Sequence, residues 1–129
     1  IPLLRQFRDA GKIVQFSPGQ TVTYPNNVLF FKLGDGTPDS IDFSNAPKLR
    51  RVFECFWELH KRNPGETVFT PTKVLDIYAE LFKQTMMRHS IAGSISNIRL
   101  TKIKPKPNLK ERFKIDFEST TKEWTFILK

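Results

Sequence analysis

The hydrophobic pattern of the first 45 residues has the short period of β-strands. Runs rich in β-branched and aromatic residues alternate with turns that contain Gly, Pro or Asn. This alternation is typical of a small antiparallel meander, which we predict over residues 13–45. The expected strands are Ile13–Phe16, Thr21–Tyr24, Val28–Lys32 and Ser40–Phe43. Residues 1–12 form a lead-in segment, for which the pattern leaves a short helix and disorder open.

Residues 46–104 change to a helical period and are expected to form a helical core. The apolar positions of a first helix recur every three or four residues. They are Leu49, Val52, Phe53, Phe56, Leu59 and His60. Ser44 or Asn45 is expected to cap the start of this helix, and Asn63-Pro64-Gly65 to end it.

A second helix is predicted to begin after Thr70, whose hydroxyl suits the N-cap, with Pro71 at the first helical position. Its apolar set is Val74, Leu75, Tyr78, Leu81 and Phe82. The linker Thr67–Phe69 between the first two helices is rich in β-forming residues. We therefore expect this linker to pair with a later strand.

A third helix is predicted from Ser90, a plausible N-cap, to the prolines at 105 and 107. Its isoleucines fall within about 60° of one another at ~100° per residue and define a buried stripe, with Lys102 on the same line. These isoleucines are Ile91, Ile95 and Ile98. Small or polar residues without an acid are expected on the opposite side, namely Ser90, Gly93, Ser94, Asn97, Thr101 and Lys104.

Residues 105–129 are expected to form a basic loop followed by a β-hairpin. Phe113, Ile115 and Phe117 alternate with charged residues, Ser119 to Lys122 forms the turn, and Thr125–Leu128 supplies the return strand. The predicted fold is therefore α+β, with a single domain over residues 13–129. A helix-turn-helix core in this domain lies between an N-terminal β-meander and a C-terminal hairpin, the layout of a winged helix.

Charge is concentrated at the end of the chain. Residues 86–129 contain ten basic and four acidic residues, so that +6 of the formal net charge of +8 lies there. A basic end on a neutral body suggests a face that binds polyanions. A solvated lysine-rich hairpin is the plain alternative.

Other kinds of site find little support in the residues. The single cysteine, Cys55, cannot form an intrachain disulfide, and its place among aromatic residues favours a small buried hydrophobe. No Cys/His spacing suits a metal, no phosphate-binding loop follows Gly34-Asp35-Gly36, and no catalytic pair is recognisable. We expect no enzyme activity, no cofactor, no metal and no membrane span.

The order of elements resembles the winged-helix effector domains of OmpR/PhoB-type response regulators. Ile41-Asp42-Phe43-Ser44 is similar to the apolar strand before that family's first helix, and residues 63–68 to its helix-ending loop. The pattern of its recognition helix is matched by Ile95, Ile98, Arg99, Lys102 and Ile103. Lys122-Glu123-Trp124 stands where the family usually carries a Gly-Tyr pair.

The resemblance implies a transcriptional regulator that binds double-stranded DNA sequence-specifically, with the third helix in the major groove and the hairpin on the backbone. Asn97 is expected to read a base, and Ser94 and Thr101 to touch bases or phosphates. Arg99 and Lys102 are expected to hold phosphates, although Arg99 could reach guanine. Sequence-independent attraction is expected from Lys104, Lys106, Lys110, Arg112 and Lys114. The helix N-termini at Ser44/Asn45, Thr70 and Ser90 could each offer free amides to a phosphate.

Partners follow from the same resemblance. In that family the loop between the second and third helices contacts the transcription machinery, and the loop here is Lys83–His89. The implied location is cytoplasmic, and nucleoid-associated in a bacterium. A homodimer stays open, because one helix reads few bases and symmetric sites are usual for small DNA-binding domains.

Twelve phenylalanines and two tryptophans leave a second function open. If Phe30, Phe31 and Trp57 lie outside the core, an aromatic patch would favour a winged helix that binds protein instead of DNA. Binding of RNA ranks last, because it would call for exposed aromatics among the lysines, and only Phe113 and Trp124 are near enough.

Overall fold

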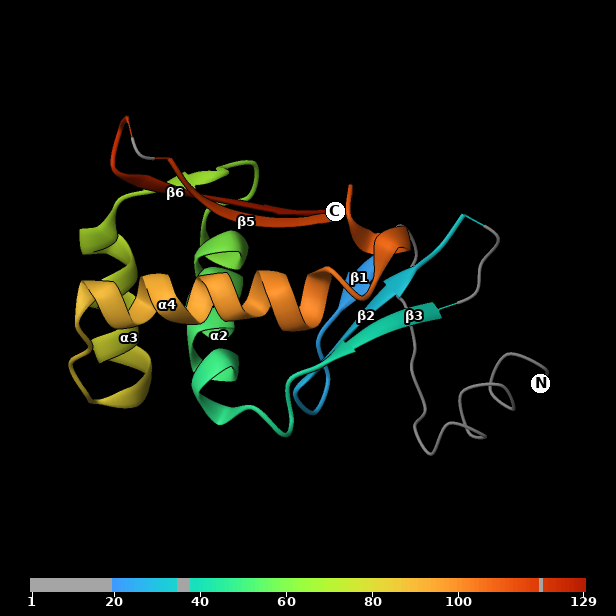
Figure 1. Ribbon diagram of the computed structural model, residues 1–129, viewed down its shortest axis with the longest axis horizontal. Helices are drawn as coiled ribbons and strands as arrows, with labels where there is room; N and C mark the ends of the chain where they lie inside the picture. Colours follow the sequence, from blue (N-terminus) through green and yellow to red (C-terminus); the bar gives the residue numbers. More distant parts are fainter. Residues whose placement is uncertain (1–19, 35–37, 119) are drawn as a thin grey trace.

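Two small antiparallel sheets and three α-helices make up residues 20–34, 38–118 and 120–129, the part described by a computed structural model (Figure 1). The chain is thus α+β. In chain order the elements are β1 (Val22–Thr23), β2 (Val28–Lys32), β3 (Pro38–Asp42), α2 (Pro47–Arg62), β4 (Val68–Phe69), α3 (Pro71–Phe82), α4 (Arg88–Ile98), the π-helical turn η1 (Arg99–Ile103), the 3-10 turn η2 (Pro107–Leu109), β5 (Phe113–Glu118) and β6 (Glu123–Leu128).

The first sheet has the strand order β1-β2-β3. Asn26 and Asn27 take positive φ values of 51° and 68° in the turn before β2, a conformation that asparagine tolerates better than most residues. Strand β2 lies where the pattern predicts it, and β3 begins two residues earlier than predicted. The lead-in segment 1–12 and the predicted strand Ile13–Phe16 lie outside the described residues.

The ends of α2 and α3 follow local chemistry. Helix α2 begins at Pro47 with Ala46 as N-cap and no side-chain cap, so the predicted cap by Ser44 or Asn45 is wrong. The Asp42 carboxylate instead accepts the Ser44 N–H in a turn before the helix. The predicted end at Asn63 is confirmed, and Thr70 caps α3 by accepting the Lys73 N–H at 3.3 Å.

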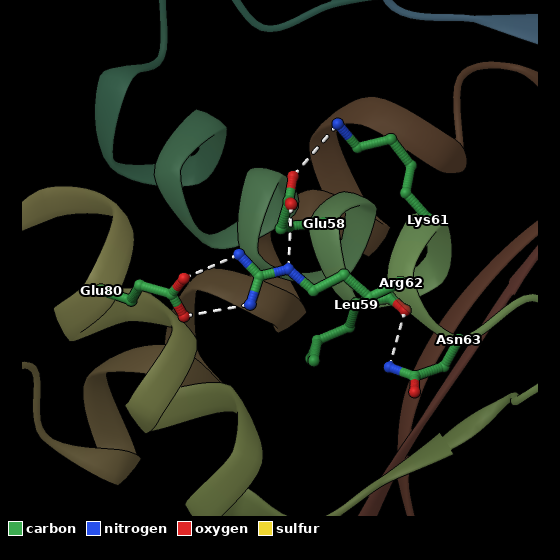
Figure 2. Close-up of polar contacts among 6 residues, drawn as sticks. All are labelled: Glu58, Leu59, Lys61, Arg62, Asn63 and Glu80. Atoms are coloured by element: carbon green, nitrogen blue, oxygen red, sulfur yellow. Dashed lines mark hydrogen bonds and ion pairs between the residues drawn. The ribbon is translucent and has the colours of Figure 1, made fainter.

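An ion-pair cluster joins the end of α2 to α3 (Figure 2). Both terminal nitrogens of Arg62 donate to the Glu80 carboxylate, at 2.8 and 3.1 Å, and its Nε donates to Glu58 at 3.0 Å. Lys61 also pairs with Glu58, at 3.1 Å, and the hydrogen bond between them contributes most to holding the pKa of that carboxyl below its usual range. The bidentate pair is exposed, so it adds a specific contact between the ends of the two helices at a small gain in stability.

Helix α4 crosses in front of α2 (Figure 1). Its isoleucines at 91, 95 and 98 are buried, as the helical spacing predicts. The helix begins at Arg88 rather than after Ser90, because the Met87 carbonyl already accepts the N–H groups of Ser90 and Ile91. The predicted N-cap at Ser90 is therefore wrong.

The second sheet has the order β4-β6-β5. Val68 pairs with Thr125 and Phe69 with Trp124, and the Thr67 carbonyl accepts the Phe126 N–H at 2.8 Å. The predicted pairing of the linker between the first two helices is thus confirmed. Strands β5 and β6 form the expected hairpin over α2 and α4.

Phe53 of α2 lies at the centre of the core. Its ring centroid is 4.6 Å from Phe43, 5.0 Å from Tyr24, 5.6 Å from Phe113 and 6.2 Å from Phe126. These four rings come from both ends of the described chain, so a single side chain links the first sheet to the hairpin. Such aromatic pairs stabilise a core by about 0.5–1.5 kcal/mol each beyond area burial.

The core also includes residues that the pattern left uncertain. Phe30 and Phe31 are buried and Trp57 is half-buried, so these three rings do not form the exposed aromatic patch that would have favoured protein binding. Cys55 is fully buried, as expected, and burial raises the pKa of its thiol to about 12. The thiol is therefore protonated and unreactive near neutral pH.

We predict that acid weakens the fold through His60. Burial between Trp57 and Phe126 lowers the pKa of this imidazole below its ordinary value of 6.5. The unfolded chain therefore binds the proton more readily, and the free energy of unfolding falls as pH is lowered through 6.5. Urea unfolding at pH 7.5 and pH 5.5 measures this change.

The matched variant is His60→Phe, which keeps a ring in the same place. It should lose less free energy of unfolding between the two pH values than the wild type does. An equal loss in both proteins would show that another group is responsible.

Candidate nucleic-acid interface

The chain from Leu81 to Lys110 contains no acidic residue, and it includes all of α4 and η1. Among its exposed residues are Arg88, Ser96, Asn97, Thr101 and Lys104. Arg88 and Ser96 were not predicted as site residues, although the acid-free stretch begins before both. A long exposed surface without carboxylates does not repel a polyanion.

Asn97 and Thr101 lie one turn apart on α4 and η1. The Thr101 hydroxyl donates to the Asn97 carbonyl oxygen at 2.6 Å, which occupies its proton within the helix. The Asn97 side chain is exposed and makes no hydrogen bond to the described residues. Its amide is thus free to pair with a ligand.

Ser94 is a correction to the predicted site. It is only 2% exposed, and its hydroxyl has no hydrogen-bond partner among the described residues. The reason is helical spacing: Ser94 is three residues after Ile91 and four before Ile98, so it shares their buried face. Ser94 therefore cannot touch bases or phosphates, and Ser90 is half-buried.

Arg112 is engaged inside the protein. Its Nε donates to the Lys129 carbonyl at 2.8 Å, and its terminal nitrogens donate to the carbonyls of Lys32 at 2.5 Å and Thr21 at 3.2 Å. The guanidinium also stacks 5.3 Å from the Phe31 ring centroid. Arg112 was predicted to attract DNA, but its hydrogen bonds instead connect the first sheet to the hairpin; we call this contact the Arg112 tie.

Two predicted lysines reach the first sheet in the same way. Lys102 donates to the Asp42 carbonyl at 2.7 Å and lies 6.0 Å from the Phe43 ring centroid. Lys106 pairs with the Asp39 carboxylate at 3.2 Å. Both ammonium groups have internal partners, which lowers their availability for phosphates.

Four predicted cations remain open to solvent. Arg99 pairs with Asp116 at 3.1 Å and Lys114 pairs with Glu111 at 3.2 Å, and all four side chains of these pairs are exposed. Exposed pairs contribute about 0–1 kcal/mol and exchange readily for a stronger anion. Lys104 and Lys110 form no ion pair with any described residue.

A groove of about 830 Å³ separates α4 and η1 from the hairpin. Leu100, which is 60% exposed, and Phe117, which is 37% exposed, contribute apolar surface to it. The four open cations Arg99, Lys104, Lys110 and Lys114 also line it. The groove thus has an apolar strip and four cations, and Asp116 and Glu118 add two carboxylates to its lining.

The hairpin itself is less basic than expected. Its described end carries Glu118 and Glu123 against Lys122. Most of the predicted lysines lie in the basic loop before the hairpin, as expected, and only Lys114 is within β5. Any basic contact is therefore centred on the base of the hairpin.

Three further searches, for metal sites, membrane-spanning helices and known relatives, gave no result that bears on this interface. No group of three His, Cys, Asp or Glu side chains is placed to hold a metal ion in the described part of the chain. Among its helices, none has the length and apolar character needed to cross a membrane. Comparison with protein-family models, curated proteins and solved structures finds no match for this chain.

We predict that Arg112→Ala lowers the free energy of unfolding by about 2–4 kcal/mol. The reason is that three carbonyl groups lose a charged donor. Hydrogen bonds to charged groups are worth about 1.5–3 kcal/mol each, and the total here is smaller than their sum because the three contacts are exposed and the carbonyls regain water. Urea unfolding followed by circular dichroism measures the loss.

Lys110→Ala is the matched control, because it removes the same charge from an exposed position two residues away. It should change the free energy of unfolding by less than about 0.5 kcal/mol. If Arg112→Ala and Lys110→Ala lowered the free energy of unfolding equally, the Arg112 tie would not stabilise the fold.

Proposed function

We propose that this chain is a winged-helix domain that binds double-stranded DNA sequence-specifically, as part of a transcriptional regulator. The support is the order α2, β4, α3, α4 and hairpin, with the sheet order β4-β6-β5. The observation that carries the proposal is α4 itself, which buries three isoleucines and exposes an acid-free polar surface. A major groove admits a helix of this kind.

Phosphates would be held mainly by the open cations of the groove. Lys104 and Lys110 are without ion-pair partners among the described residues, and Arg99 and Lys114 would exchange their exposed carboxylates for phosphate. Lys102, Lys106 and Arg112 contribute indirectly, by fixing the base of the interface. The basic residues would therefore not all contribute equally to phosphate binding.

Base recognition would come from Asn97. A side-chain amide can accept from and donate to adenine at the same time, which no phosphate contact can do. Thr101 keeps its methyl group for a thymine, because its hydroxyl proton is already donated to the helix. As a DNA-binding protein, the chain would act in the cytoplasm, and on the nucleoid in a bacterium.

A protein-binding role is the second proposal. One observation that favours it is Met87, which is 65% exposed in the loop Lys83–His89 and offers an adaptable apolar contact. Met86 beside it is half-buried against the core. This loop would suit the transcription machinery without competing with α4 for DNA.

We predict strongly salt-dependent binding to duplex DNA of random sequence. Four phosphate contacts give a slope of about −3.6 in log K against log salt, so binding weakens roughly a hundredfold from 50 to 200 mM. Lys104→Ala/Lys110→Ala should reduce the magnitude of the slope by about 1.8. Fluorescence anisotropy of a labelled duplex measures both quantities.

Lys48→Ala/Lys61→Ala on α2 is the control, since it removes two charges from exposed positions outside the groove. It should leave the slope nearly unchanged. No binding by the folded wild type at 50 mM salt would retire the DNA proposal in favour of a protein partner.

Asn97→Ala tests the assignment of the base-reading residue. We expect a loss of about 1–3 kcal/mol on the preferred site and a relaxed preference at one base pair. Selection of binding sites from a random pool, followed by anisotropy on single-base variants, measures this. Ser94→Ala is the control and should bind as the wild type, because Ser94 is buried. An unchanged preference in Asn97→Ala would remove this residue from the site.

A further inference from the structure

Strand β5 forms one edge of the second sheet. The order β4-β6-β5 places β6 on one side of this strand, and no strand formed by residues 20–34, 38–118 or 120–129 lies on the other. The groove beside α4 and η1 is lined by side chains from both faces of β5, Phe113, Ile115 and Phe117 on one face and Lys114 and Asp116 on the other. The groove therefore runs along the free edge of this strand.

The hydrogen-bond pattern of the hairpin shows which backbone groups face the free edge. Lys129 donates its N–H to the Arg112 carbonyl, so the residues that pair with β6 by hydrogen bonds are the even-numbered ones. The N–H and C=O groups of Phe113, Ile115 and Phe117 then point away from β6. An edge with free donors and acceptors is a template for another strand.

One edge donor already has a partner within the protein. The Asp116 carboxylate accepts the Phe117 N–H at 2.8 Å and an Arg99 N–H at 3.1 Å. Both contacts are exposed and local. A strand that offers a carbonyl to Phe117 and a cation to Asp116 would replace them at little cost.

We propose that the occupant of this edge is β5 of a second copy of the chain. The two strands would run antiparallel about a twofold axis and join two three-stranded sheets into one. The backbone groups of Phe113, Ile115 and Phe117 point to the free edge, so these residues must form hydrogen bonds with the same three residues of the partner. This requirement allows only certain registers. Centred on Ile115, the pairs are Ile115 with the partner's Ile115 and Phe113 with the partner's Phe117.

Charge selects this register. Centred on Ile115, Lys114 lies opposite the partner's Asp116, and by symmetry Asp116 lies opposite the partner's Lys114. A shift of the centre by one residue to either side places Lys114 opposite the partner's Lys114, or Asp116 opposite the partner's Asp116. Opposite charges across a pair of strands attract and like charges repel, and of these three registers only the first has no like-charged pair.

Apolar surface beside the edge supports the same occupant. Leu100 and Phe117 are exposed in a groove that also includes Ile103. The partner's Phe113 and Phe117 lie on the face of the joined sheet that carries the helices. Pairing would therefore cover the apolar strip of both copies at once.

The test is sedimentation velocity of the full chain without nucleic acid, from about 1 µM to about 1 mM, the range of weak self-association. We expect the wild type to pass from its monomer mass of 15.0 kDa toward twice that value. Lys114→Asp and Asp116→Lys should each weaken the dimer about tenfold or more, since each places two like-charged pairs across the axis. The double variant Lys114→Asp/Asp116→Lys should restore it.

The two single variants also distinguish the specific pairing from general repulsion between two basic chains, because they change the net charge in opposite directions. Lys114→Asp lowers the net charge of +8 by two and Asp116→Lys raises it by two, so repulsion alone would strengthen one dimer and weaken the other. Lys48→Asp on α2 is a further control that lowers the charge without touching β5, and it should not weaken the dimer. Circular dichroism confirms that each variant is folded.

Three outcomes would overturn the proposal: a wild type that stays monomeric over the whole range, a dimer that ignores both single reversals, or a double variant as weak as the singles. The partner's strand and phosphates would occupy the same groove, so pairing and DNA binding would compete. The proposal does not depend on DNA binding, because every measurement is made on the protein alone. A dimer with no affinity for DNA would leave it standing.

Discussion

The arrangement of the described chain depends on the ring of Phe53. Rings from the first sheet and from the hairpin converge on this side chain of α2, at centroid distances between 4.6 and 6.2 Å. Because α4 crosses α2 and the groove lies between α4 and the hairpin, this contact also sets the relative position of the two walls of the groove. A change in the size of this one ring would move both walls, so the core and the candidate interface cannot vary independently.

The basic residues form two groups: one stabilises the fold and the other is open to a ligand. Lys102, Lys106 and Arg112 attach the end of the chain to the first sheet through carbonyl groups and one carboxylate. The open cations of the groove are those with exposed partners or none among the described residues. A net charge counted along the sequence overstates the charge that a ligand would meet, because part of it stabilises the fold.

Local patterns were enough to predict much of the fold but less of the site. Strand β2, the Thr70 cap and the buried isoleucines of α4 each follow from neighbours in sequence. The partners of Arg112 lie 17 to 91 residues away, and no local pattern contains that information. The burial of Ser94 follows from its spacing to Ile91 and Ile98, which outweighs the polarity of its side chain. The winged-helix assignment and DNA binding stay predictions.

The turn η1 has a further consequence for how this chain could diverge. Its closing hydrogen bond runs from the Lys104 N–H to the Arg99 carbonyl, five residues back, so the turn holds one residue more than an α-helix would. Because this wider turn absorbs the extra residue locally, removing one residue would give regular α-helical winding and leave the chain beyond it in nearly the same direction. The segment from α4 to η1 could thus change its length by one residue while the path into β5 and the core stay as they are.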